Sequence, residues 1–196
     1  MPKGTVQVLL KGNTMSPHSR NDKLLRPDKA TDHIRGPASA PVTLIEYGDF
    51  ECPMCYQAET ALKIMFSHFD SQLRFVFRHF PLREVHPHAE LAAEAAEAAG
   101  AQGKFWPMHE LLFTRSQHLK EKQLMEYAEQ IGMDLPRYRY EMNDHVYLQR
   151  VQEHMQGARH LGVRSTPTFY VNGVFADVSF GLQHLHESID KALLHH

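Results

Sequence analysis

The stretch VTLIEYGDFECPMC, residues 42–55, changes from the pattern of a strand to the pattern of a helix. Residues 42–47 are rich in β-branched and aromatic side chains and lie between a proline and a glycine, which predicts a short, buried strand. After this strand, apolar residues recur at spacings of three and four, as on one face of a helix. They are Cys55, Ala58, Leu62, Met65, Phe66 and Phe69. Pro53 suits the first helical position, because its missing N–H would have no partner there.

Both cysteines of the chain lie at the predicted start of this helix. Cys52 is expected at the N-cap and Cys55 one turn inside, which brings the two sulfurs within bonding reach. The free amides and the positive end of the helix dipole favour a thiolate at Cys52, and a thiolate is the attacking species in disulfide exchange. Asp49 and Glu51 oppose this effect, but we expect their carboxylates to face water. The pattern therefore predicts a reactive dithiol.

The rest of the chain predicts an α/β fold with a block of helices in its middle. A second strand is expected at residues 73–80, and because about twenty residues of helix precede it, the two strands should be parallel. Further helices are predicted at residues 89–99, 105–115, 121–131, 134–142 and 146–161. The last predicted elements are strands at 168–171 and 174–178 and a helix at 182–194. Asn172-Gly173 is a strong hairpin signal between these two strands.

Composition excludes several classes of protein. The 196 residues carry a formal net charge of −2, so the chain lacks the basic field that nucleic-acid binding by counterion release requires. No apolar run approaches the roughly 18 residues of a membrane span, and residues 6–10 are too short for the core of a signal peptide. We therefore expect no membrane insertion and a cytoplasmic location, or a periplasmic one if the sequence is that of a mature chain.

From about Asp32 to its end, the chain resembles the DsbA-like branch of the thioredoxin superfamily. Four features in this order carry the resemblance. They are Glu46-Tyr47-Gly48-Asp49-Phe50-Glu51-Cys52-Pro53-Met54-Cys55, Arg78-His79-Phe80-Pro81-Leu82, the helical block after the second strand, and Gly162-Val163-Arg164-Ser165-Thr166-Pro167-Thr168-Phe169 with Val171-Asn172-Gly173. The subgroup that the chain is most similar to lacks a signal peptide and also occurs as C-terminal domains of sodium/proton antiporters.

The resemblance implies a domain division. Residues 32–196 would form a thioredoxin-like domain with a helical insertion at about 87–162. Residues 1–31 are polar and rich in turn-forming residues, and we expect an N-terminal arm there, with Gly4–Leu10 as a candidate edge strand.

The resemblance also implies a role for individual residues. Cys52 would be the nucleophile that forms a mixed disulfide with a partner, and Cys55 the resolving thiol. Glu46 would be a buried acid that assists proton transfer at the dithiol. The peptide bond before Pro167 would be cis and would leave the Thr166 backbone free to pair with an extended substrate. We expect substrate contacts from Thr166, Pro53, Met54 and Phe50.

The expected function is that of a thiol–disulfide oxidoreductase acting on protein or peptide thiols, with a recycling redox partner, no organic cofactor and no metal site. Two alternatives remain. One is a peptide-binding thioredoxin-like module that uses its cysteines little. The other is a zinc or redox sensor in which His86 and His88 join the cysteines, although these histidines lack the usual ligand spacing. Met54 stands where the family often has His or Tyr, so we expect a Cys52 thiol less acidic than in the most oxidising members.

Overall fold

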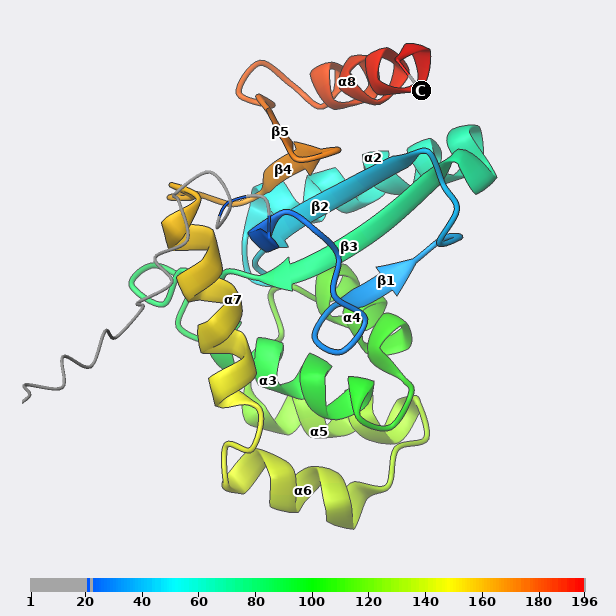
Figure 1. Cartoon of the computed structure of the whole chain (residues 1–196). Coiled ribbons are helices and arrows are strands. Elements are labelled where there is room, and N and C mark those ends of the chain that lie inside the picture. Colours follow the sequence, from blue (N-terminus) through cyan, green and yellow to red (C-terminus); the bar gives the residue numbers. More distant parts are fainter. Residues whose placement is uncertain (1–20, 22, 196) are drawn as a thin grey trace, which may run out of the picture.

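The computed structural model describes residue 21 and residues 23–195. Its centre is a mixed five-stranded sheet with the strand order β1-β3-β2-β4-β5 (Figure 1). The strands are β1 (His33–Arg35), β2 (Val42–Gly48), β3 (Leu73–His79), β4 (Thr168–Val171) and β5 (Val174–Ala176). This confirms the predicted α/β fold, and the sheet holds the strands that flank the two cysteines.

The unit β2-α2-β3 has the predicted form. β2 and β3 are parallel, with Val42 paired to Leu73, and α2 (Pro53–Phe69) and the short 3₁₀ helix η1 (Asp70–Gln72) connect them. β4 returns antiparallel beside β2, and the hairpin to β5 turns at Asn172 and Gly173, whose φ angles are 47° and 81°. Positive φ at both positions is what this turn requires and what Asn-Gly tolerates.

Five helices lie between β3 and β4 in the sequence, within the predicted insertion. They are α3 (Ala89–Gly100), α4 (Phe105–Thr114), α5 (Glu121–Gln130), α6 (Leu135–Asn143) and α7 (Leu148–His160). In Figure 1, α3 to α6 gather beyond the side of the sheet that carries β1, whereas α8 (Gln183–Leu194) lies beside β4 and β5. In the part of the chain that the structure describes, no helix is both long enough and apolar enough to cross a membrane.

The core has a part on each face of the sheet, because successive residues of a strand point to opposite faces. Leu44 of β2 packs with buried residues of α2, α4 and α8. Ile45 and Tyr47 pack on the other face with residues of α7, among them Val151 and Met155. The sheet is therefore covered on both sides, and β2 lies buried at its centre.

β1 is an edge strand that the sequence analysis did not predict. It pairs antiparallel with β3, with His33 opposite Phe77. The edge strand expected at Gly4–Leu10 lies outside the described residues. A strand of three residues is too short to show the alternation of apolar and polar side chains by which a strand is recognised in a sequence. It is stabilised by its pairing with β3 rather than by its own residues.

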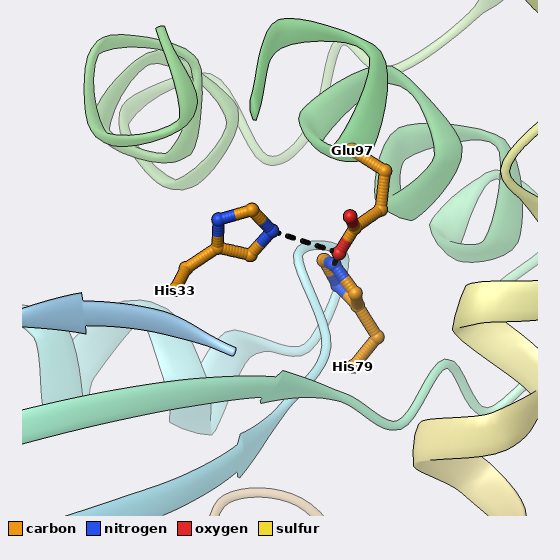
Figure 2. A group of neighbouring side chains, drawn as sticks. All are labelled: His33, His79 and Glu97. Carbon is orange, nitrogen blue, oxygen red and sulfur yellow. Dashed lines mark hydrogen bonds and ion pairs between the residues drawn. The ribbon is translucent and has the colours of Figure 1, made fainter. Parts of the chain in front are cut away.

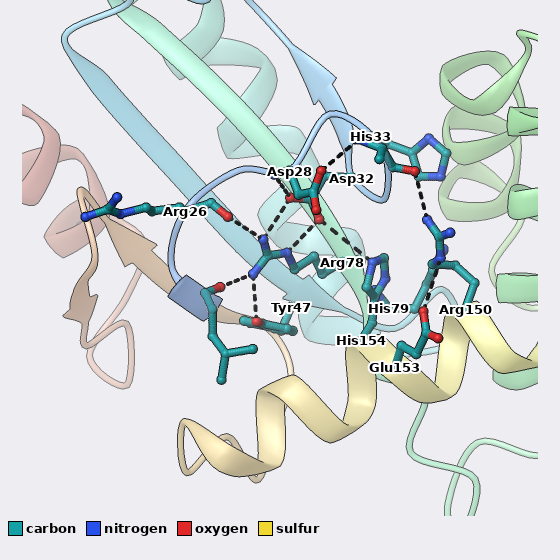
Figure 3. A network of polar contacts seen from close by, with 12 residues as sticks. Arg26, Asp28, Asp32, His33, Tyr47, Arg78, His79, Arg150, Glu153 and His154 are labelled. Atoms are coloured by element: carbon teal, nitrogen blue, oxygen red, sulfur yellow. Dashed lines mark hydrogen bonds and ion pairs between the residues drawn. The ribbon is translucent and has the colours of Figure 1, made fainter. Parts of the chain in front are cut away.

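Arg78 of β3 anchors the segment before β1 to the sheet (Figure 3). Its guanidinium donates to both carboxylate oxygens of Asp32, at 2.7 and 2.8 Å, and to the Tyr47 hydroxyl at 3.0 Å. It also donates to the backbone carbonyls of Leu24 and Arg26. Asp32 and Arg78 are both buried, so this network fixes where the chain enters the fold.

Candidate active site

The two cysteines lie where β2 leads into α2, as predicted. Cys52 is the N-cap of α2 and has an extended backbone with φ −76° and ψ 122°, and Pro53 is the first helical residue. Both side chains are free thiols, Cys52 being 5% exposed and Cys55 completely buried. A partner can therefore reach only one of the two sulfurs, that of Cys52.

The loop before β4 faces Cys52. The Cys52 sulfur lies 3.4 Å from the Thr166 carbonyl oxygen, to which it can donate when it is protonated, and the Thr166–Pro167 peptide bond is cis. The register places Thr168 opposite Tyr47 of β2, so the sheet itself carries this loop to the dithiol.

The surroundings of Cys52 favour its thiolate. The pKa of Cys52 is lowered from 9.0 to about 5. The hydrogen bond from the Cys55 thiol contributes most, and hydrogen bonds from the Thr166 side chain and from the backbone amides of Cys55 and Met54 add to it. Together they outweigh burial, which acts in the opposite direction. The pKa of Cys55 is raised well above its ordinary value, mainly by burial and also by its hydrogen bond to Cys52 and by the neighbouring Glu46. At neutral pH one sulfur is therefore charged, and the other holds a proton.

Glu46 lies on β2 behind the dithiol and is 1% exposed. Burial raises the pKa of its carboxyl well above the ordinary value, and the charges of Glu59 and Cys52 add to this. Gly48 leaves room for the Glu46 side chain, because a Cβ at position 48 would lie 2.5 Å from a Phe77 ring carbon and 3.1 Å from Glu46 Oε1. Glu46 can therefore hold a proton beside Cys55 under conditions in which an exposed glutamate would be ionised.

The expectation that Asp49 and Glu51 face water is wrong for Asp49 and holds only in part for Glu51, whose side chain is 18% exposed. Asp49 is 2% exposed and accepts hydrogen bonds from the Leu82 amide at 2.8 Å and His86 Nδ1 at 2.7 Å. Glu51 accepts from the amide and from Nδ1 of His88, at 2.7 and 2.9 Å. These carboxylates fasten the loop after β3 to the loop before α2, and they already bind the two histidines considered as zinc ligands.

Phe50 does not lie where a substrate could contact it, which corrects the sequence analysis. It is 1% exposed and packs against Phe77 and Phe113, with ring centroids 5.2 and 4.8 Å apart. The side chains exposed beside Cys52 are instead those of Pro53 and Met54, and Met54 is 56% exposed. The loop turns Phe50 inward because the helical insertion supplies an aromatic pocket on that side.

The sequence analysis missed Glu59. It lies on the buried face of α2 and is 8% exposed, and burial raises its pKa to about 7, against the opposing charges of Lys63 and Arg35. A carboxyl at the i+4 position from Cys55, on the apolar stripe of the helix, is the signal that could have identified it. Glu59 contributes to the raised pKa of Glu46 and so belongs to the surroundings of the dithiol.

Solved structures with this arrangement of elements include a thioredoxin-like oxidoreductase and a protein named DsbA1. The oxidised BdbD of Bacillus subtilis is similar with a TM-score of 0.77 and 21% identity, covering 86% of this chain and 96% of that one. A thioredoxin-like oxidoreductase of Silicibacter pomeroyi has a TM-score of 0.75 and 25% identity, covering 89% and 98%. The α-DsbA1 of Wolbachia pipientis has a TM-score of 0.75 and 21% identity, with the same coverage.

Curated relatives share more of the sequence. The Na⁺/H⁺ antiporter NhaA 1 of Salinispora arenicola is 45% identical over 171 residues, which are 87% of this chain and 26% of that protein. NhaA 1 of Mycolicibacterium gilvum is 43% identical over 154 residues, 77% of this chain and 25% of its own length. The chain thus spans about a quarter of the length of these relatives. A family model described as thioredoxin matches residues 28–191. The chain therefore belongs to the thioredoxin family, and its fold is that of the DsbA-like members.

Proposed function

We propose that this chain is a thiol–disulfide oxidoreductase that exchanges disulfides with protein or peptide thiols through Cys52 and Cys55. The observation that carries the proposal is the asymmetry of the two sulfurs. Cys52 lies at a helix N-terminus with a pKa of about 5, and Cys55 is buried with a raised pKa. A stable thiolate beside a protonated thiol is the arrangement that disulfide exchange requires.

The exchange follows from this asymmetry. A substrate thiolate attacks the Cys52 sulfur of the oxidised form, the Cys52–Cys55 bond breaks, and its electron pair leaves on Cys55. Glu46, held protonated by burial, supplies the proton that Cys55 takes up. A second substrate thiolate then attacks the substrate sulfur of the mixed disulfide and releases Cys52 as a thiolate. The substrate gains a disulfide, and the dithiol is reduced by two electrons.

We propose that the substrate backbone binds along the loop at Thr166. Its carbonyl is already within 3.4 Å of the Cys52 sulfur, so a peptide joined to Cys52 must run beside it. Backbone pairing of that kind gives affinity with little sequence selectivity. Exposed Met54 and Pro53 border the same sulfur and would contact the substrate side chains.

The direction of exchange follows from which redox state the site stabilises. A thiolate with a pKa of about 5 stabilises the reduced form, so the disulfide form is the better oxidant and should donate its disulfide. Equilibration in glutathione buffers, read by alkylation and mass, tests this. A potential of about −120 to −180 mV supports a disulfide donor, whereas about −250 mV or below would make the protein a reductase.

Single cysteine variants separate the proposal from its alternatives. Cys55→Ser should accumulate a mixed disulfide with a cysteine-containing peptide, and Cys52→Ser should form none. If Cys52→Ser binds the peptide as well as wild type does, and wild type shows no turnover, the protein is instead a peptide-binding module. Zinc retained on the reduced cysteines without a measurable disulfide would refute the oxidoreductase proposal.

A further inference from the structure

A second group of reactive side chains lies away from the dithiol. His33 begins β1, His79 ends β3 and Glu97 lies on α3, and their side chains point toward one another (Figure 2). Nε2 of His33 lies 2.9 Å and Nε2 of His79 lies 2.8 Å from the same oxygen, Oε1 of Glu97. His33 pairs with Phe77, so His79 is two residues further along β3 and faces the same side of the sheet.

The packing around His33 holds its ring in place. The imidazole stacks on the Phe105 ring with centroids 3.5 Å apart and planes 4° apart. Gly100 makes the space for it, since a Cβ at that position would lie 2.6 Å from Cε1 of His33. The ring therefore lies directly against α3, one helical turn from Glu97. The His33 side chain remains 18% exposed, which gives the group a side open to solvent.

Glu97 is a buried acid, only 6% exposed. Within the described residues, the ion-pair partners of Glu97 are these two histidines. A buried carboxylate is normally paired with a cation or bound to a metal ion.

We propose that His33, His79 and Glu97 form a binding site for a divalent cation of the zinc type. Two imidazole nitrogens and one carboxylate oxygen are a donor set that zinc accepts, with water in the fourth position. The three ligand atoms lie within 4.8 Å of one another. Around a zinc ion with bonds of about 2.0–2.2 Å they would be about 3.3 Å apart, so small side-chain shifts suffice. Each histidine binds as its neutral Nδ1–H tautomer.

The position of the site indicates what the cation would do. It would join β1, β3 and the first helix of the insertion, three segments that meet only in the folded chain. Binding to the folded state alone stabilises that state in proportion to the logarithm of the metal concentration over Kd. The cation would therefore fasten the helical insertion to the sheet, independently of Cys52 and Cys55.

The test uses the full chain without a purification tag, with Cys52 and Cys55 oxidised so that no thiol can bind zinc. After chelator treatment and desalting, Zn²⁺ alone is titrated by calorimetry, and bound metal is measured by mass spectrometry. We expect one Zn²⁺ per chain, and at least tenfold weaker binding in both His33→Ala and Glu97→Gln. Far-UV circular dichroism confirms that each variant is folded.

His186→Ala is the matched control. His186 donates to Asp190 at 3.0 Å, and its ring centroid lies 5.1 Å from that of His68, so two histidines and a carboxylate also gather there. We expect this variant to bind zinc as the wild type does. Loss of the zinc in His186→Ala, or equal affinity in His33→Ala and wild type, would overturn the proposal, as would no binding in the wild type.

Thermal unfolding gives a second readout should Glu97→Gln not fold. Zn²⁺ should raise the Tm of the oxidised wild type and leave that of His33→Ala unchanged. X-ray absorption of the bound zinc should show nitrogen and oxygen neighbours. A zinc-induced rise of Tm that is the same in His33→Ala would refute the site.

Discussion

The pKa of Cys52 makes the stability of the reduced protein depend on pH in a defined direction. The folded pKa of about 5 lies below the ordinary value of 9.0. Such a group contributes its full stabilisation above the unfolded pKa and loses it as the pH falls through the folded pKa. At pH 7 the contribution is about 3 kcal/mol, and at pH 5 about 0.4 kcal/mol. Acidification from pH 7 to pH 5 should therefore remove about 2 kcal/mol.

Urea unfolding of the reduced protein at pH 5, 6 and 7 measures this, with Cys52→Ala as the reference. The reference is needed because Glu46 acts in the opposite direction. Burial raises the pKa of Glu46, so its contribution is present below the unfolded pKa and is lost as the pH rises through the folded pKa. The difference in unfolding free energy between wild type and Cys52→Ala should grow from pH 5 to pH 7. A difference that stays constant over this range would refute the thiolate argument.

The remaining predictions concern single side chains. Met54→His should lower the pKa of the nucleophilic thiol further, because an imidazolium can stabilise a thiolate and a thioether cannot; an unchanged midpoint of alkylation rate against pH would contradict this. Glu46→Gln should slow attack by Cys55 on a mixed disulfide at least about tenfold. In wild type the rate of this step should rise as the pH passes the raised pKa of Glu46, because the ionised carboxylate takes the Cys55 proton, and stopped-flow kinetics of the variant should lack that rise. Arg78→Leu should cost about 3–5 kcal/mol in urea unfolding, because the buried charge of Asp32 loses its partner. The double variant with Asp32→Leu should recover part of the loss, and no recovery would mean that packing, not charge, is what Arg78 contributes.

The sequence was sufficient for features that depend on neighbours along the chain. The strand at 42–47, the proline at the first helical position and the period of three and four after Cys55 predict the β2-loop-α2 unit, and the structure has it. Parallel pairing of β2 with β3 followed from the length of the connection. The Asn172-Gly173 turn followed from the φ angles that these two residues tolerate.

The sequence was insufficient wherever burial decides the role of a residue. Asp49 and Glu51 are polar and next to the cysteines, so water was the expected partner, but the chain after β3 folds over them and supplies His86 and His88. Phe50 was likewise expected to contact the substrate because it is close to Cys52 in the sequence. Its neighbour Phe113 is far along the chain, and only the insertion brings it there.

The sequence by itself determined that a dithiol begins a helix after a buried strand, and therefore which sulfur is favoured as a thiolate, because helix periodicity and capping are local. Only the tertiary structure decided the protonation of Cys55 and Glu46, since both depend on burial by distant segments. The group of His33, His79 and Glu97 also exists only in the folded chain. Its hydrogen bond between His33 and Glu97 joins residues 64 positions apart, and cross-strand pairing with helix docking, rather than any spacing in the sequence, brings them together.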